Sequence, residues 1–198
     1  MIPRATLLAL SILALTTAGA SAQRVSPLTY DDPEFEWLDN RDPDSPRPSP
    51  NAFAGLQIGS TRVMVAYGSP AAKERTIFGG LVPFDQVWRT GANEATTVTI
   101  NGDVVVEGRE LKKGTYTLFT IPRESEWTVI LNANNNQWGA YERDPEEDIL
   151  EFKVPSEGGE YRENLTFGFD GIHPDGSAAS LLIAWETTVV RLVIEEAE

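Results

Sequence analysis

The sequence contains no cysteine and only one histidine, His173. The absence of cysteine excludes disulfide bonds, thiolate zinc sites, a cysteine nucleophile and a lipid-modified cysteine. With a single histidine, a histidine-rich metal site is impossible, and any Ser-His-Asp triad would have to include His173. That residue lies in the segment IHPDG, which is typical of an exposed turn. We therefore expect no metal centre and no bound cofactor.

Positive charge is also scarce. Sixteen Lys and Arg residues stand against 30 Asp and Glu residues, which gives a net charge of -14. Such a charge repels the phosphates of nucleic acids and anionic lipid surfaces, so we expect neither as a partner. Hydrophobic residues still make up 41% of the 198 residues, enough for the core of one domain with appendages.

Long apolar runs are missing except near the start of the sequence. There, Arg4 precedes an apolar stretch over residues 5–15, and the segment Ala20-Ser21-Ala22 follows. About ten apolar residues ending at an A-x-A site are typical of a cleavable signal peptide, whereas a membrane-spanning helix needs roughly 20. We expect residues 1–22 to be removed, which leaves a mature chain without a membrane span in the periplasm or outside the cell. Cleavage would remove only the charge of Arg4, so the net charge would change from -14 to -15.

Residues 23–50 form an acidic, proline-rich arm or linker. Four prolines lie between positions 43 and 50, where they withhold backbone donors and disfavour helix. The arm also contains Tyr30, Phe35 and Trp37, which are unusual in a solvated linker. We therefore expect part of the arm to lie across the domain.

From residue 51 the pattern changes to short β-strands separated by turn residues. Apolar and β-branched runs predict strands at 56–58, 62–67, 96–100, 104–106, 115–121, 127–131, 149–154, 165–169, 179–185 and 188–194. These short strands at near-regular spacing favour one all-β domain over residues 51–198, an antiparallel β-sandwich or a jelly roll. Turns are expected at Gly158-Gly159 and at 174–176.

Alternation within the strands predicts which side chains form the core. We expect five residues to be largely buried: Tyr116, Leu118, Trp127, Val129 and Leu131. Two segments interrupt the strand pattern, at 73–93 and 132–148. Both exceed the usual hairpin loop of about two to five residues, and long ordered loops commonly carry binding functions.

Several strings in and beside these loops resemble those of a known family. They are IFGGLVPFDQVWRTGANEATTVTI, GTYTLFTIP, EWTVILN and NQWGAY. They resemble a secreted bacterial family catalogued as domain of unknown function 2911, over about residues 50–195. The resemblance implies an exported bacterial protein and supplies no mechanism or cofactor. The acidic arm between Tyr30 and Pro50 looks like an addition to the family pattern.

The first loop contains a candidate binding cluster of Trp88, Arg89, Asn93 and Glu94. A planar guanidinium binds carboxylates or sugar hydroxyls with fixed geometry, the amide and the carboxylate add donors and acceptors, and the indole offers a stacking face. The alternative is structural, with Arg89 paired to Glu94 and Trp88 in the core.

The second loop contains Gln137, Trp138 and Tyr141, beside a run of three asparagines. Amides flanked by aromatic rings resemble the chemistry of carbohydrate-binding surfaces. The alternative is that Trp138 and Tyr141 close one end of the sandwich. We expect the two loops to meet and to frame one polar pocket.

No catalytic motif of known spacing occurs in the chain. This favours a non-enzymatic binding module of the periplasm or cell surface, with a small polar or saccharide ligand. One alternative is an exported glycosidase-like hydrolase, with Glu94 as acid or base and Asp85 or Glu142 as its partner. Another is a structural subunit of the cell envelope.

Overall fold

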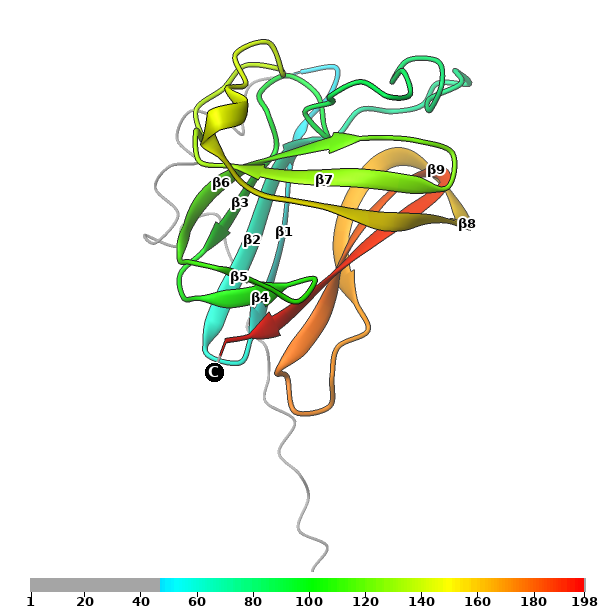
Figure 1. Cartoon of the computed structure of the whole chain (residues 1–198). Coiled ribbons are helices and arrows are strands. Elements are labelled where there is room, and N and C mark those ends of the chain that lie inside the picture. Colours follow the sequence, from blue (N-terminus) through cyan, green and yellow to red (C-terminus); the bar gives the residue numbers. More distant parts are fainter. Residues whose placement is uncertain (1–46, 198) are drawn as a thin grey trace, which may run out of the picture.

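The computed structural model describes residues 47–197 and consists almost entirely of antiparallel strands (Figure 1). The strands are β1 Asn51–Ile58, β2 Thr61–Gly68, β3 Thr97–Ile100, β4 Val104–Val106, β5 Arg109–Leu111, β6 Gly114–Ile121, β7 Glu126–Asn132, β8 Asp148–Asp170 and β9 Ala178–Glu196. A 3-10 helix, η2, covers Pro145–Glu147. The expected all-β domain is confirmed. Within residues 47–197, no helix has the length and apolar character needed to cross a membrane.

All nine strands belong to one hydrogen-bonded sheet with the order β1-β2-β3-β6-β7-β8-β9-β4-β5. Strand β8 changes partner along its length: residues 148–155 pair with β7, and the part from Ser156 pairs with β9. The β1–β2 turn reaches the other part of the sheet, because Gly59 N donates to Gly176 O (2.8 Å) and Ser60 N donates to Glu196 Oε1 (3.0 Å). The sheet thus closes over its own core like a sandwich.

The turn expected at Gly158-Gly159 is wrong, because both glycines lie inside β8. The register with β9 shifts between Gly158 and Arg162, and again between Arg162 and Thr166. Such irregularities bend a strand without ending it, so glycines that look like a turn in the sequence mark a bend instead. The two strands expected at 179–185 and 188–194 likewise form one strand, β9.

The core contains the five residues expected there. Tyr116 is 9% exposed, and Leu118, Trp127, Val129 and Leu131 are at most 3% exposed. An aromatic cluster lies at one end of this core and comprises Phe78, Trp88, Trp127 and Trp185. The indoles of Trp88 and Trp185 stack at 6.0 Å with an interplanar angle of 22°. Trp88 therefore belongs to the core, as its structural alternative required.

The two long loops lie at the same end of the molecule (Figure 1). The β4–β5 hairpin and the end of β9 lie at the opposite end. The end of the molecule that carries the two loops therefore also contains the start of β1 and the aromatic cluster.

Candidate functional site

The first loop is attached to the sheet along β6, just beyond the start of β3. Trp88 N donates to Thr120 O (2.7 Å), and Thr120 N donates to Trp88 O (2.9 Å), so Trp88 extends the pairing along β6. The hydroxyls of Thr90 and Thr120 lie 3.0 Å apart, and Thr96 Oγ1 donates to Thr90 O (2.9 Å). The backbone on both sides of Arg89 is therefore fixed by buried hydrogen bonds.

The same loop packs tightly against the end of β2. Ala92 N donates to Gly68 O (3.2 Å), and a Cβ added at Gly68 would lie 2.1 Å from Ala92 O. Only glycine allows this approach. Thr90 has φ 53°, a left-handed conformation that turns the chain between Arg89 and Gly91.

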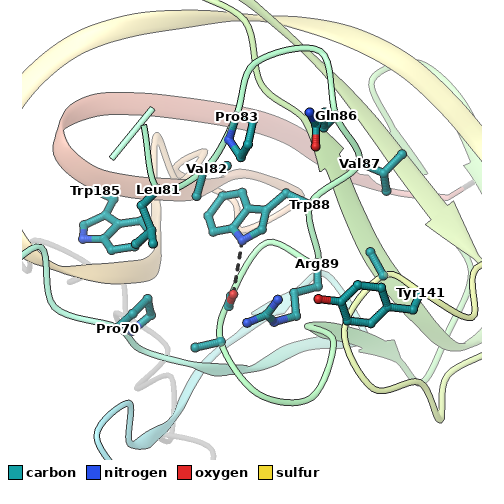
Figure 2. A pocket seen from close by; sticks show the side chains of 13 residues that line it. Pro70, Leu81, Val82, Pro83, Gln86, Val87, Trp88, Arg89, Tyr141 and Trp185 are labelled. Carbon is teal, nitrogen blue, oxygen red and sulfur yellow. Dashed lines mark hydrogen bonds between the residues drawn. The ribbon is translucent and has the colours of Figure 1, made fainter. Parts of the chain in front are cut away.

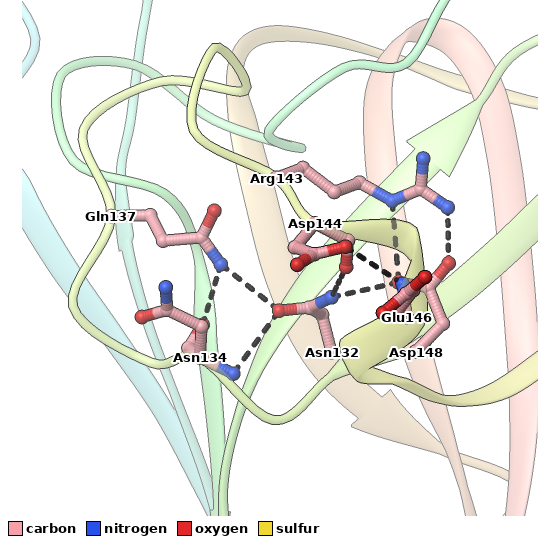
Figure 3. A network of polar contacts seen from close by, with 7 residues as sticks. All are labelled: Asn132, Asn134, Gln137, Arg143, Asp144, Glu146 and Asp148. Carbon is pink, nitrogen blue, oxygen red and sulfur yellow. Dashed lines mark hydrogen bonds and ion pairs between the residues drawn. The ribbon is translucent and has the colours of Figure 1, made fainter.

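The second loop is held by a buried polar network around Asn132 (Figure 3). Asn132 is fully buried, and its Nδ2 donates to Asp144 O (2.9 Å) and Asp148 Oδ1 (2.8 Å). Its Oδ1 accepts from Gln137 Nε2 (3.0 Å), which also donates to Asn134 O (2.7 Å). The amide of Gln137 is thus used to shape the loop.

The two loops lie side by side. Ala95 N donates to Gln137 O (3.1 Å), and Glu94 and Trp138 form an antiparallel β-bridge. The contact is made by backbone groups, so it does not depend on the identity of the side chains in the two loops.

A pocket of about 400 Å³ opens where the loops approach the aromatic cluster (Figure 2). It is lined by Pro70, Leu81, Val82, Pro83, Gln86, Val87, Trp88, Arg89, Gly91, Ala92, Ala140, Tyr141 and Trp185. Most of these residues are apolar, and Arg89 is the only charged one among them. The volume is within the range of small-molecule sites.

Arg89 points into this pocket, and the Tyr141 hydroxyl points toward its guanidinium (Figure 2). Arg89 Nε is buried and has no hydrogen-bond partner. Within residues 47–197, no ion pair to its guanidinium is found. Burial lowers the pKa of Arg89 from its ordinary value, and the neighbouring Tyr141 acts in the opposite direction. An arginine remains charged under these conditions, so the pocket holds a half-buried cation without an anionic partner among residues 47–197.

Three of the seven expected ligand-binding residues line the pocket: Trp88, Arg89 and Tyr141. Trp88 forms its floor, with Nε1 donating to Gly91 O (3.2 Å). Tyr141 is 89% exposed and forms its rim. Trp138 is 58% exposed, so neither aromatic residue closes the end of the sandwich.

The other expected residues are engaged elsewhere. Glu94 binds Arg47 instead of Arg89, with Arg47 Nη1 donating to its two oxygens at 2.7 and 2.8 Å. Asn93 Nδ2 donates to Ser49 O (3.1 Å). Both contacts fasten the described end of the arm to the first loop. Residues 1–46, which include the expected signal peptide and the arm aromatics, lie outside the described residues.

The apolar wall of the pocket was not anticipated from the sequence. It comes from Leu81, Val82 and Pro83 in the first loop, Pro70 after β2, and Trp185 in β9. The apolar triplet Leu81-Val82-Pro83 could have indicated this wall, because apolar residues are unusual in a long polar loop. Leu81 is not there to fill the core, since its side chain is 48% exposed. Trp185 is a strand residue far along the chain, and its place beside the loop follows only from the sheet topology.

The acids considered for catalysis do not gather at the pocket. Asp85 pairs with Arg123 (2.6 Å), and neither Asp85 nor Glu142 lines the pocket. Within residues 47–197, no group of three or more His, Asp or Glu side chains is arranged to hold a metal ion. His173 lies in an exposed turn, where its Nδ1 is 2.6 Å from Asp175 Oδ1.

A second hollow, of about 620 Å³, lies near the end of β9, and among the described residues its only cation is Lys112, beside the carboxylates of Asp103, Glu110, Glu195 and Glu196. Lys112 Nζ lies 3.1 Å from Asp103 and 3.4 Å from Glu110. Glu196 Oε1 accepts from Ser60. The pocket beside Arg89 is the stronger candidate for a small organic ligand, because its wall is mostly apolar and its one charged residue has no ion pair within residues 47–197.

Comparison with known proteins gives one match. The family described as a protein of unknown function, DUF2911, matches residues 49–194, which confirms the resemblance carried by the loop strings. No curated protein and no solved structure matches this chain.

Proposed function

We propose that this protein, which belongs to the DUF2911 family of proteins of unknown function, is an exported binding protein without catalytic activity. Its ligand is a small organic anion with an apolar body, and its site is the pocket beside Arg89. One observation carries the proposal: a half-buried guanidinium, with no partner for its buried Nε, faces a pocket with apolar walls. A buried charge without a partner is unfavourable, so a bound anion would stabilise the guanidinium by pairing with it.

The apolar wall favours this ligand class over a saccharide. Sugar sites present several free polar side chains, whereas Asn93 and Gln137 donate to other parts of the chain. The pocket wall consists of aliphatic, proline and indole groups, which favour an apolar body. The hydrolase alternative loses support, because Glu94 is bound by Arg47 and does not line the pocket.

The test is a thermal-shift and calorimetric screen of the mature protein. The probes are phenylacetate, 3-phenylpropanoate, octanoate and indole-3-acetate, each compared with its neutral amide. At least one anion should raise the melting temperature progressively, with the logarithm of its concentration above the Kd, because ligands that bind the folded state stabilise it by mass action. The effect should disappear in Arg89→Gln and persist in Arg162→Gln, which changes an exposed arginine on β8. Equal shifts for all anions and amides would contradict the proposal.

Export rests on Arg4, the apolar stretch at 5–15 and the Ala20-Ser21-Ala22 site. Mass spectrometry of the protein expressed with its full N-terminus in a bacterial host should give a chain that begins at or near Gln23. Recovery of a chain that retains Met1 would contradict this part of the proposal and leave the pocket untouched.

A further inference from the structure

The charges that line the pocket indicate how many negative charges its ligand carries. Arg89 is the only charged residue among those that line the pocket, and no carboxylate accompanies it. The whole chain carries a net charge of -14. One guanidinium can neutralise one negative charge, so a dianion would keep an unmatched charge in a half-buried site of an acidic protein.

Within residues 47–197, no helix N-terminus lines the pocket to bind a phosphate. Phosphate sites commonly add free N–H groups from a helix N-terminus or a glycine-rich loop. The only helix in residues 47–197 is η2, which is one turn long and does not line the pocket. The N–H groups of Trp88 and Ala92, which do line it, donate to Thr120 O and Gly68 O.

The donors that remain suit a planar carboxylate. The Nε–H and an Nη–H of a guanidinium lie on one edge and can bind both oxygens of a carboxylate in its plane. In Arg89 the Nε of this edge is buried without a partner. The Tyr141 hydroxyl, which faces the same guanidinium, adds a neutral donor and no charge (Figure 2).

The position of the Tyr141 ring depends on a glycine. Gly139 has φ 73°, and a Cβ at this position would lie 2.9 Å from the Tyr141 ring. The ring is otherwise 89% exposed, so it can adjust to a ligand without disturbing the core.

From these observations we infer that the ligand carries a single carboxylate, which Arg89 and the Tyr141 hydroxyl bind together while the apolar wall holds its body. This inference rests on the proposed function and adds the identity of the charged group.

The experiment uses three probes with similar phenyl bodies: 3-phenylpropanoate, 3-phenylpropanamide and 2-phenylethyl phosphate. Calorimetry of the mature protein at pH 7 should show the carboxylate binding about tenfold or more tightly than either of the others. Tyr141→Phe should weaken carboxylate binding by about three- to tenfold and leave amide binding unchanged, as expected for one neutral hydrogen bond. Arg89→Gln should abolish the preference for the carboxylate. Circular dichroism of each variant shows whether it is folded, and Gly139→Ala gives a second way to displace Tyr141.

The outcomes separate the two claims. Phosphate binding as tight as carboxylate binding would overturn the inference and leave the proposed function standing. Unchanged carboxylate affinity in both Tyr141→Phe and Gly139→Ala would also overturn it, since Tyr141 would then take no part. If neither anion binds more tightly than the amide, the proposed function itself fails.

Discussion

Arg47 Nη1 donates to both carboxylate oxygens of Glu94, at 2.7 and 2.8 Å, across 47 residues of sequence. The two side chains are only 23% and 18% exposed. Beside them, Asn93 donates to Ser49 O, and Ser69 N donates to Pro50 O (2.8 Å). The described end of the arm is therefore attached to the loop that carries Arg89.

Glu94→Gln should destabilise the protein by about 1–3 kcal/mol, because Arg47 would keep a largely buried charge without its partner. Urea unfolding followed by circular dichroism measures the change. The matched control is Lys153→Gln, which breaks an exposed pair with Glu126 and should change stability by less than about 1 kcal/mol. Equal effects of the two substitutions would show that the Arg47 contact does not anchor the loop.

Asn132→Ala should destabilise the protein by about 2–4 kcal/mol, because it removes four hydrogen bonds from a buried network and opens a cavity there. Gln137 Nε2 and Asp148 Oδ1 each lose one of their partners, and Asn134 N loses the acceptor Asn132 Oδ1 (Figure 3). Asn135→Ala is the control, since this exposed amide makes one contact, to Thr115 O (3.2 Å). Amide hydrogen exchange in residues 133–147 should accelerate in the first variant only. Unchanged exchange there would mean that Asn132 does not hold the loop.

The strands could be predicted from the sequence because alternation and turn residues act over a few positions. Trp127, Val129 and Leu131 alternate toward the core, as expected for one buried face. The prediction failed at Gly158-Gly159, where a glycine pair reads as a turn in any local pattern. Whether such a pair ends or bends a strand depends on the partner strand. Here β9 pairs with β8 on both sides of the glycines, so the strand continues.

The candidate site was only partly predictable for the same reason. Arg89 and Tyr141 stand out by residue type, and both line the pocket. Glu94 is close to Arg89 in the sequence, which made it the expected ion-pair partner in the structural alternative. In the structure, Glu94 forms its ion pair with Arg47 instead. Trp185 lies about 100 residues after Trp88 in the sequence, and the topology of the sheet brings the two together. A pattern of neighbouring residues carries no information about such a long-range contact.

Asp175 should stabilise the fold in a pH-dependent way. Its Oδ1 accepts from Ser177 Oγ (2.6 Å), His173 Nδ1 (2.6 Å) and Ser177 N (2.9 Å). Hydrogen bonds from the Ser177 hydroxyl, then His173 and the Ser177 N–H, hold the pKa of Asp175 well below its ordinary value. A carboxyl with a lowered pKa in the folded state contributes stability above its unfolded pKa, about 3.9, and loses it as the pH falls further.

Asp175→Asn should therefore be less stable than the natural protein at pH 6, and this difference should shrink as the pH falls below about 4. Urea unfolding between pH 3 and pH 6 measures the difference. Ser177→Ala, which removes the largest cause of the shift, should reproduce part of the pH dependence. A difference that stays constant over this range would show that Asp175 has the same affinity for protons in the folded and unfolded chain.

The substitution Arg89→Met tests whether the fold itself has any use for the charge of Arg89. Methionine is unbranched and flexible, so it can replace the packing of the arginine stem without the guanidinium. Because the Nε of that guanidinium is buried without a hydrogen-bond partner, its removal should leave the free energy of unfolding of the ligand-free protein unchanged, or raise it by about 1–2 kcal/mol.

The matched control is Arg143→Met, since Arg143 is similarly buried but forms an ion pair with Asp148, with side chains 15% and 12% exposed. Removing Arg143 leaves Asp148 without its cation and should lower the free energy of unfolding by about 3–5 kcal/mol. Both values come from urea unfolding of the ligand-free protein. A loss of this size in Arg89→Met would make Arg89 a structural residue. Unchanged stability would mean that the fold does not need this charge, and increased stability would mean that the fold maintains an unfavourable charge for a ligand, the trade between stability and function that marks a binding site.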